Sequence, residues 1–472
     1  MRKGLIDEKK ELVDYAIRKA TSMGADYAEA TFESSRGESY TIKNSVMSGA
    51  VIAESQGLRV RFLNGGYIYS LSTNQPDKDS LERLMESNML LRGEGPTGME
   101  ISRERTSAEY KVKYGRYDSR ELQNFITRLD RDISKYAPIK SRFVTAGFSI
   151  VSRYYMNSEG SVIESTIPYS DGFMTVTVES KGERRQRNIQ FGAADGIEYF
   201  ERAKLDEKAL EDAKNMKKVI DNGINTRESF SNVVISSEIA GIAVHESVGH
   251  PNEADRVLGR EAAQAGTSYV TPENLGMRIG SKEVTICDDP TIKNSYGFYL
   301  YDDEGVQARN RTIVENGMQN ELLHNRQSAY ALKTESNGSA RSTAVGFEPI
   351  IRMANTYLTP GKADLDELIE EAKNGIYVKN FTEWNIDDTR SFSRYQGNEA
   401  YLIENGRIGK PVKNFVLETR TLDFWSAVEL KSRDFVLYAG TCGKGEPEQG
   451  VPVLMGGPDV LLKFDKRGNA KR

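Results

Sequence analysis

The sequence contains very few of the residues that form disulfide bonds or bind transition metals. Among 472 residues there are only two cysteines, Cys287 and Cys442, and three histidines, His245, His250 and His324. Two cysteines cannot form a disulfide framework, and such low usage is typical of a reducing compartment. Two of the three histidines lie within one short segment, so this segment is the first place to look for chemistry.

Long apolar runs and a strong charge of one sign are also missing. No segment approaches the roughly 18 to 20 apolar residues that cross a bilayer, and residues 1–20 form a charged helical pattern without the apolar stretch of a signal peptide. We therefore expect a cytoplasmic protein that has no membrane partner. The net charge of −5 gives no general attraction to nucleic acid. We expect the basic runs 181–188 and 466–472 to be a solvated loop and a tail.

Length and residue periodicity predict two domains. A chain of 472 residues exceeds one ordinary hydrophobic core. Strand patterns occupy 25–72 and 142–181. Helical patterns in the first half occupy 7–22, 77–92, 117–136 and 204–220. The polar segment 221–231 then predicts a boundary, which gives domains 1–224 and 225–472.

In the second half, strand patterns dominate. A strand is expected at 231–236, directly before the histidine segment. Helices are expected at 253–264, 364–373 and 422–430. The predicted fold class is α+β, with an N-terminal α+β domain followed by a mainly β C-terminal domain that carries a metal-binding helix.

The histidine segment, HESVGH at 245–250, is a variant of a zinc-peptidase helix. Such helices carry His-Glu-x-x-His, whereas His245 and His250 are five positions apart. On a regular helix these positions point about 140° apart. A local π-type turn returns them to one side, and Gly249 followed by Pro251 loosens the backbone there.

The residues before this segment predict a buried helix. The helix is apolar nearly all round, Ser236 or Ser237 can cap its start, and Glu238 suits its first turn. One interpretation is two buried histidines that backbone carbonyls satisfy. Glu246 favours a metal instead, because a buried carboxylate needs a positive partner. In a zinc peptidase, this glutamate is the general base.

A catalytic zinc needs a third protein ligand. The candidates are Cys442, Cys287, His324, Glu253 and Asp255. Cys442 follows the strand pattern 434–439, on an expected glycine-rich loop that can stabilise a thiolate and leave space for a metal. Cys287 ends an alternating run and is expected in the core. The GTCGKG stretch does not predict nucleotide binding, because Gly445 stands where a phosphate loop has Ser or Thr.

Further motifs occur along the whole chain. They are GADYAEATFE (24–33), GLRVRFL (57–63), YDDEG (301–305), ENG (315–317), GSARS (338–342), RMANTYL (352–358), EAYLIENG (399–406), and TCGKG (441–445) with GVPV and GGP after it. Together with HESVGH, they resemble the TldD/PmbA family of metallopeptidases, in particular its zinc-bearing TldD branch. The resemblance covers nearly the whole sequence.

The resemblance implies a zinc metallopeptidase that hydrolyses unfolded or extended polypeptides in an enclosed site. It implies that His245, His250 and Cys442 bind the zinc and that Glu246 is the catalytic base. It also implies a homodimer, or a heterodimer with a related subunit of the family. The alternative is a non-catalytic assembly or regulatory subunit of a TldD-type complex, which the intact set of four residues disfavours.

Two features have no role that the resemblance implies. His324 lies in a family-like segment but has no ligand role to carry over. The run 385–398, before EAYLIENG, departs from the expected spacing. A regulator of topoisomerases is a further function attached to the family, and neither the net charge nor a basic aromatic stripe supports it here.

Overall fold

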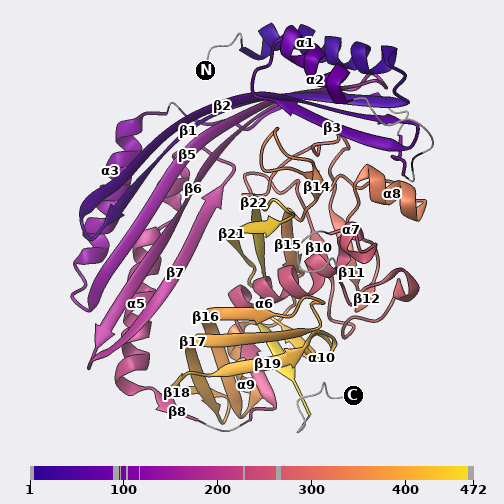
Figure 1. The fold of residues 1–472 in the computed structure, drawn as a ribbon. Coiled ribbons are helices and arrows are strands. Elements are labelled where there is room, and N and C mark those ends of the chain that lie inside the picture. Colours follow the sequence, from indigo (N-terminus) through magenta and orange to yellow (C-terminus); the bar gives the residue numbers. More distant parts are fainter. Residues whose placement is uncertain are drawn as a thin grey trace.

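The computed structural model describes residues 5–88, 95, 97–101, 105–115, 117–226, 229–261 and 267–465. Long strands from the first half of the chain form one curved sheet, which arches over the C-terminal half (Figure 1). The C-terminal half consists mainly of shorter strands with a few helices. The predicted α+β fold class with a mainly β C-terminal part is therefore confirmed. The domain boundary between residues 224 and 225 stays a prediction.

The N-terminal sheet has seven strands in the order β3-β2-β1-β5-β6-β4, and β7 also pairs with β6. Successive side chains of a strand point to opposite faces, and in β5 the alternate residues Val144, Ala146 and Phe148 enter the core. The strands predicted within 25–72 and 142–181 are confirmed. The sheet contains β1 (Tyr27–Lys43), β2 (Val46–Asn64), β3 (Tyr67–Thr73), β4 (Ser107–Lys111), β5 (Ile139–Asn157), β6 (Val162–Ser180) and β7 (Glu183–Ala193).

Helices cover the outer face of this sheet (Figure 1). The four helices predicted in the first half are confirmed as α1 (Leu5–Ser22), α2 (Lys78–Asn88), α3 (Ser119–Ser134) and α5 (Leu205–Asn222), and α4 (Tyr199–Arg202) is short. Helix α5 also contacts strands of the C-terminal half. Helix α3 starts where the Asp118 side chain accepts a hydrogen bond from Arg120 N at 2.9 Å. Residues 89–92 of the second predicted helix lie outside the described residues.

The described C-terminal half contains two large sheets and one strand pair. One sheet has the order β12-β11-β10-β15-β22-β21, which makes β21 an edge strand. The other has the order β20-β23-β9-β16-β17-β18-β8, with β19 beside β17, and β13 pairs with β14. The strands are β8 (Ile224–Asn225), β9 (Asn232–Ile235), β10 (Ile286–Asp288), β11 (Arg311–Glu315), β12 (Met318–Gln319), β13 (Ala340–Arg341), β14 (Ile350–Ile351), β15 (Asn355–Leu358), β16 (Gly375–Ile386), β17 (Phe392–Glu404), β18 (Arg407–Lys413), β19 (Val416–Arg420), β20 (Val428–Lys431), β21 (Val436–Lys444), β22 (Gln449–Gly457) and β23 (Val460–Lys463).

Helix α6 (Ser237–Val244) lies between the two large sheets and contacts β22 on one side and β16 on the other. This close approach requires Gly241, because a Cβ there would lie 2.7 Å from the Gly456 backbone nitrogen. The other helical segments are η1 (His245–Gly249), η2 (His250–Asn252), α7 (Ala254–Val257), η4 (Pro272–Asn274), α8 (Arg326–Leu332), α9 (Leu365–Ala372) and α10 (Thr421–Ser426). Within the described ranges, no helix is both long and apolar enough to cross a membrane.

Two of the three helices predicted in the C-terminal half are too long. Helix α9 confirms the prediction at 364–373. The helix predicted over 253–264 is shorter in the structure, because α7 ends at Val257 and Gly259, with a φ of +67, turns the chain. Residues 262–266 lie outside the described residues. The helix predicted over 422–430 is also shorter, because α10 ends at Ser426. The following residues instead form β20, which pairs with β23, so sheet pairing overrides the local helical pattern.

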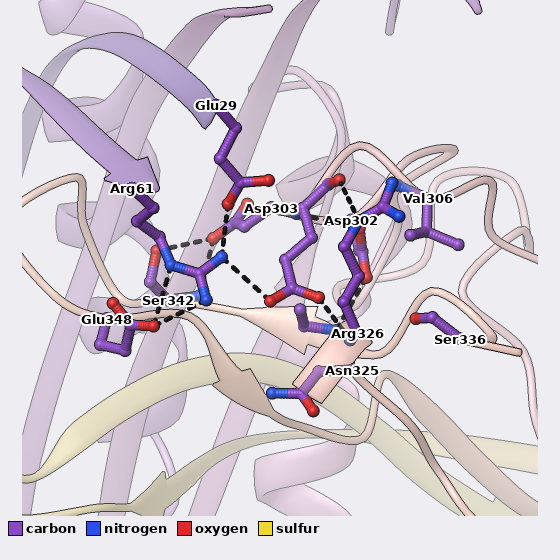
Figure 2. Close-up of polar contacts among 12 residues, drawn as sticks. Glu29, Arg61, Asp302, Asp303, Val306, Asn325, Arg326, Ser336, Ser342 and Glu348 are labelled. Carbon is purple, nitrogen blue, oxygen red and sulfur yellow. Dashed lines mark hydrogen bonds and ion pairs between the residues drawn. The ribbon is translucent and has the colours of Figure 1, made fainter. Parts of the chain in front are cut away.

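A buried network of charged side chains joins the N-terminal sheet to loops of the C-terminal half (Figure 2). Arg61 of β2, only 2% exposed, lies at its centre and pairs with Glu29 of β1. From the C-terminal half, Glu304 lies 3.0 Å and Glu348 2.7 Å from the same guanidinium. These pairs connect segments that are more than 240 positions apart in the chain, and so they fix the concave face of the sheet relative to the C-terminal half.

Candidate metal centre

Three of the predicted site residues lie together inside the C-terminal half. The donor atoms of His245, His250 and Cys442 are all within 4.8 Å of one another. Cys442 Sγ is 3.5 Å from His250 Nε2, and the centroids of the two imidazole rings are 4.9 Å apart. All three side chains are buried. Among the described residues, this is the one group of three such donors close enough to hold a metal ion.

The backbone widens at the histidines as their spacing predicted. His245–Gly249 is a π-helical turn, and His250 N donates to His245 O, five residues earlier. The predicted π-type turn is therefore confirmed, and it places both rings on one side of the helix. Gly249 has an ordinary helical conformation with φ −57. Glycine is needed here because Met353 packs closely against it, and a Cβ at this position would lie 2.0 Å from Met353 Sδ.

Buried hydrogen bonds hold this turn in place. Ser247 Oγ donates to Ala243 O at 2.6 Å and accepts from Trp425 Nε1 at 2.9 Å. Tyr269 OH donates to Ser247 O at 2.8 Å. A π-helical turn is rarely stable without support from its surroundings, and these contacts, from both sides of the turn, fix the position of the two histidines.

The cap of helix α6 differs from the prediction. Ser236 is the N-cap residue, but its side chain makes no capping hydrogen bond. Asp459 caps the helix instead, because its Oδ1 accepts a hydrogen bond from Ser237 N at 2.9 Å. The start of the metal helix is thus tied to the loop that follows β22.

Glu238, in the first turn of α6, forms an ion pair with Arg187 of β7 at 2.6 Å. Arg187 also pairs with Asp212 of α5 at 3.2 Å and is 4% exposed. The prediction of a solvated loop at 181–188 is therefore wrong, because most of this run forms β7, and Arg187 connects the N-terminal sheet to the metal helix. The second basic run, 466–472, lies outside the described residues.

Cys442 lies on the edge strand β21, so the prediction of a glycine-rich loop is wrong. It pairs with Val451 of β22. The fully buried Arg352 donates to the carbonyl oxygen of Cys442. Burial disfavours a thiolate, but the positive charges of His250 and Arg352 outweigh burial and hold the pKa of the Cys442 thiol well below its usual range. The sulfur is therefore suited to bind a cation as an anion.

Glu253 and Asp255, considered above as third ligands, lie behind the donor cluster. Glu253 Oε2 accepts from His250 Nδ1 at 2.9 Å, which directs His250 Nε2 toward Cys442. Burial lowers the pKa of His250, but Glu253 and Cys442 outweigh it and raise this pKa to about 9. Lys444, two residues after the cysteine, balances the acids at 3.1 Å from Glu253 and 2.8 Å from Asp255.

The other two candidates do not join the cluster. Cys287 is a buried residue of β10, and its sulfur lies 3.9 Å from Thr312 Oγ1. His324 lies before α8, where its Nδ1 contacts Ser328 Oγ at 3.0 Å. Burial lowers the pKa of His324 to about 4, so its imidazole is neutral at pH 7. The core position expected for Cys287 is confirmed.

Glu246 has a partner that the sequence did not reveal. Its Oε2 accepts a hydrogen bond from Arg390 Nη1 in a buried ion pair. The buried carboxylate that favoured a metal thus already has a positive partner within the chain. Arg390 lies 144 positions further along the chain, within the run 385–398 whose spacing was unexplained. No periodicity or short motif could have identified it.

A cavity of about 790 Å³ reaches the donor cluster and Glu246. Both halves of the chain form its walls. Strand β7 contributes Arg187 and Gln190, β16 contributes 381–386, and β21 contributes 438–443. A cavity of this size is in the range of substrate sites, and it places the three donors and a carboxylate at one wall.

The donor set fits zinc. Two imidazole nitrogens and a thiolate are ligands that zinc prefers, and three protein ligands with an open fourth position are typical of a catalytic zinc site. The low pKa of the Cys442 thiol and the carboxylate behind His250 both favour a bound cation. A calcium or magnesium ion would prefer oxygen ligands.

Comparison with known families identifies the chain by class. Residues 228–464 match the PmbA/TldA metallopeptidase C-terminal domain. Residues 28–90 match domain 1 of the same family, and residues 113–217 match its central domain. The chain therefore belongs to the TldD/PmbA family of metallopeptidases, and the resemblance found in the sequence is confirmed.

Individual relatives agree with this assignment. A metalloprotease of Methanocaldococcus jannaschii is 31% identical over 459 residues, which cover 93% of this chain and 96% of that protein. A zinc metalloprotease TldD homolog of Saccharolobus solfataricus is 33% identical over 237 residues, covering 50% and 51% of the two chains. In fold, the chain is similar to TldE from Thermococcus kodakarensis, with a TM-score of 0.72 at 16% identity over 96% of this chain and 98% of that one.

Proposed function

We propose that the protein is a zinc-dependent peptidase that hydrolyses unfolded or extended polypeptides. The observation that carries this proposal is the convergence of the His245, His250 and Cys442 donors and the Glu246 carboxylate at one wall of a cavity. Membership of a metallopeptidase family supports the reaction class, and the zinc metalloprotease among the relatives supports the metal.

The roles follow from the positions of the side chains. His245, His250 and Cys442 would hold the zinc, which supplies a Lewis acid that polarises a peptide carbonyl and lowers the pKa of water. Glu246 accepts one proton from the attacking water. As the peptide C–N bond breaks, Glu246 returns that proton to the amine nitrogen, so that one water yields one carboxylic acid and one amine.

The place of the donors in the fold supports an extended substrate. Cys442 lies on β21, the edge strand of its sheet. A strand edge can pair with the backbone of an extended chain, and this gives affinity without a demand for particular side chains. A folded protein already uses its backbone groups in internal hydrogen bonds and cannot offer them here.

The second candidate function is a non-catalytic subunit of a TldD-type complex. The assembled donors together with Glu246 disfavour it, because a subunit that only assembles has no use for a metal-binding cluster beside a base. Assembly itself stays part of the proposal, as a homodimer or as a heterodimer with a related subunit, and the likeness of this fold to TldE supports it.

Metal analysis and a cleavage assay test this proposal. We expect about one zinc per chain and cleavage of a destabilised variant of a substrate protein much faster than of its slowly unfolding native form. Glu246→Gln should keep the zinc and lose activity by roughly 10² to 10⁴, the usual worth of a general base. Full turnover in that variant contradicts the role of Glu246, and equal cleavage of native and destabilised substrate contradicts the enclosed site.

A further inference from the structure

Arg390 is a buried cation at the wall of the metal cavity. It is 4% exposed, and its Nη1 donates to Glu246 Oε2. Both residues line the cavity of about 790 Å³. The guanidinium thus contacts the carboxylate that directly follows a zinc donor, although it comes from the turn between β16 and β17, in the other large sheet.

The backbone of Arg390 has an unfavourable conformation. Its φ is +63, in the left-handed region where glycine and asparagine are common and long side chains are rare. Several contacts hold the turn there: Arg390 N donates to Asp387 O at 2.9 Å, and Thr421 Oγ1 donates to Arg390 O at 2.5 Å. Glycine would adopt this backbone conformation more easily. An arginine in strained backbone, fixed from several sides, indicates that its side chain is needed where it lies.

We propose that Arg390 is the positioning residue of Glu246. This inference rests on the proposed function, because it gives Arg390 its part in peptide hydrolysis. The ion pair occupies Oε2 and fixes the rotamer of Glu246, so that Oε1 is the oxygen that exchanges the proton with the attacking water. Without the guanidinium, the carboxylate is free to rotate out of line or to approach the metal donors as an unwanted ligand. A geometric error of about 1 Å in a reacting group can cost about 10²-fold in rate.

The first test uses the metal-free protein and needs no catalytic activity. Arg390→Gly relieves the backbone and leaves Glu246 buried without its guanidinium. We expect the Tm of this variant to fall by roughly 5 °C or more, because one partner of a buried ion pair has been removed. Combined with Glu246→Gln, the same change should cost little, since the carboxylate that needed the cation is gone. If the decreases in Tm caused by the two single substitutions add in the double variant, the pairing of Arg390 with Glu246 is overturned.

Lys373→Gly is the matched control for the backbone. Lys373 also has a positive φ, of +57, but it lies on the surface after α9 and away from the cavity. Its replacement should also relieve backbone strain at a positive φ, and it should change neither the Tm response to Glu246→Gln nor the cleavage rate. This separates the loss of a guanidinium from the gain of a glycine.

The second test uses the zinc-loaded protein. Arg390→Gly should keep about one zinc per chain and a nearly unchanged KM, while kcat falls about 10²-fold. Millimolar guanidinium ion should restore part of kcat in this variant and none in Glu246→Gln or Lys373→Gly, because only Arg390→Gly leaves a guanidinium-sized space beside the base. Arg390→Lys should retain part of the rate. No rescue, or a change confined to KM, overturns the positioning role, whereas absence of any peptide cleavage by the unaltered zinc-loaded protein overturns the proposed function itself.

Discussion

Two buried polar clusters of this protein are built in opposite ways. Around Arg61, the carboxylates of Glu29, Glu304 and Glu348 surround one cation (Figure 2). Around His250, three electron-pair donors face one another within 4.8 Å. In the first cluster, each carboxylate touches the guanidinium of opposite charge. The second brings together atoms that repel one another unless a proton or a metal ion lies among them.

The protonation of His250 shows what the second cluster lacks. Burial alone disfavours an imidazolium, yet Glu253 and the Cys442 thiolate raise the pKa of His250 to about 9. In the metal-free protein, a proton on His250 therefore balances the charge that a cation would balance. A cluster whose charges are already paired can hold two parts of a fold together. A cluster that needs an added cation is suited to bind one.

The largest expected effect comes from removing a donor of the second cluster. Cys442→Ser should lower the zinc content from about one per chain to near none, because a serine hydroxyl is a poor zinc ligand at neutral pH. Elemental analysis of the purified protein measures this. Cys287→Ser is the matched control and should keep the zinc, since Cys287 lies in β10 outside the donor cluster. The reverse pattern means that the wrong cysteine has been assigned.

The next largest effect breaks the first cluster instead. Arg61→Ala leaves buried carboxylates without their cation and should lower the free energy of unfolding by about 3 to 5 kcal/mol. Zinc content should stay near one per chain, because Arg61 does not contact the metal donors. Denaturant unfolding followed by metal analysis measures both. Arg36→Ala, which removes an exposed pair with Glu54 on the same sheet, should leave stability nearly unchanged.

A smaller effect concerns the pH dependence of zinc binding. The pKa of His250 is raised to about 9, so this ring carries a proton at pH 7 that must leave before Nε2 can bind zinc. The pKa of Cys442 is lowered, so its thiol has already lost the proton. Zinc affinity should therefore rise about tenfold per pH unit from neutral pH and level off near pH 9.

Glu253→Gln sharpens this test. The substitution removes the carboxylate that contributes most to raising the pKa of His250, so the affinity should level off at a lower pH. At that plateau, zinc should bind about 10 to 100 times more weakly, because the hydrogen bond that orients the ring loses its charge. Competition with a chromogenic chelator measures both quantities. A rise of two decades per pH unit means that Cys442 is still protonated in the metal-free protein.

The parts of the site that follow from local geometry could be predicted from the sequence. His245 and His250 are five positions apart, so they share one side only if the helix widens, and the structure has that turn. The strand pattern before Cys442 was visible, but the strand continues through the cysteine, because pairing with β22 extends it beyond the point where glycines suggest a loop. Periodicity indicates that an element exists more reliably than where it ends.

The partners of the site residues could not be predicted in this way. Arg390 pairs with Glu246 across 144 positions of the chain, and Lys444 pairs with Asp255 across 189 positions. Neither spacing nor composition indicates which carboxylate a given cation meets. Arg187 shows the same limit. A run rich in arginine is usually solvated, yet this run forms a strand, and Arg187 pairs with Asp212 and Glu238. Long-range pairing depends on the complete fold.

The smallest effect concerns Gln190 of β7, whose side chain occupies the edge of β21 beside Cys442. Its Oε1 accepts from Thr441 N at 3.2 Å and its Nε2 donates to Thr441 Oγ1 at 2.6 Å. A substrate carbonyl that pairs with this edge must replace the amide at the same backbone donor. Gln190→Ala should therefore lower KM for an unfolded peptide by about 2- to 10-fold, the worth of one hydrogen bond, with little change in kcat. Gln186→Ala, on the same strand but bonded to Asn188, is the matched control and should change neither constant. If KM rises in Gln190→Ala and not in the control, the Gln190 side chain binds the substrate and does not compete with it.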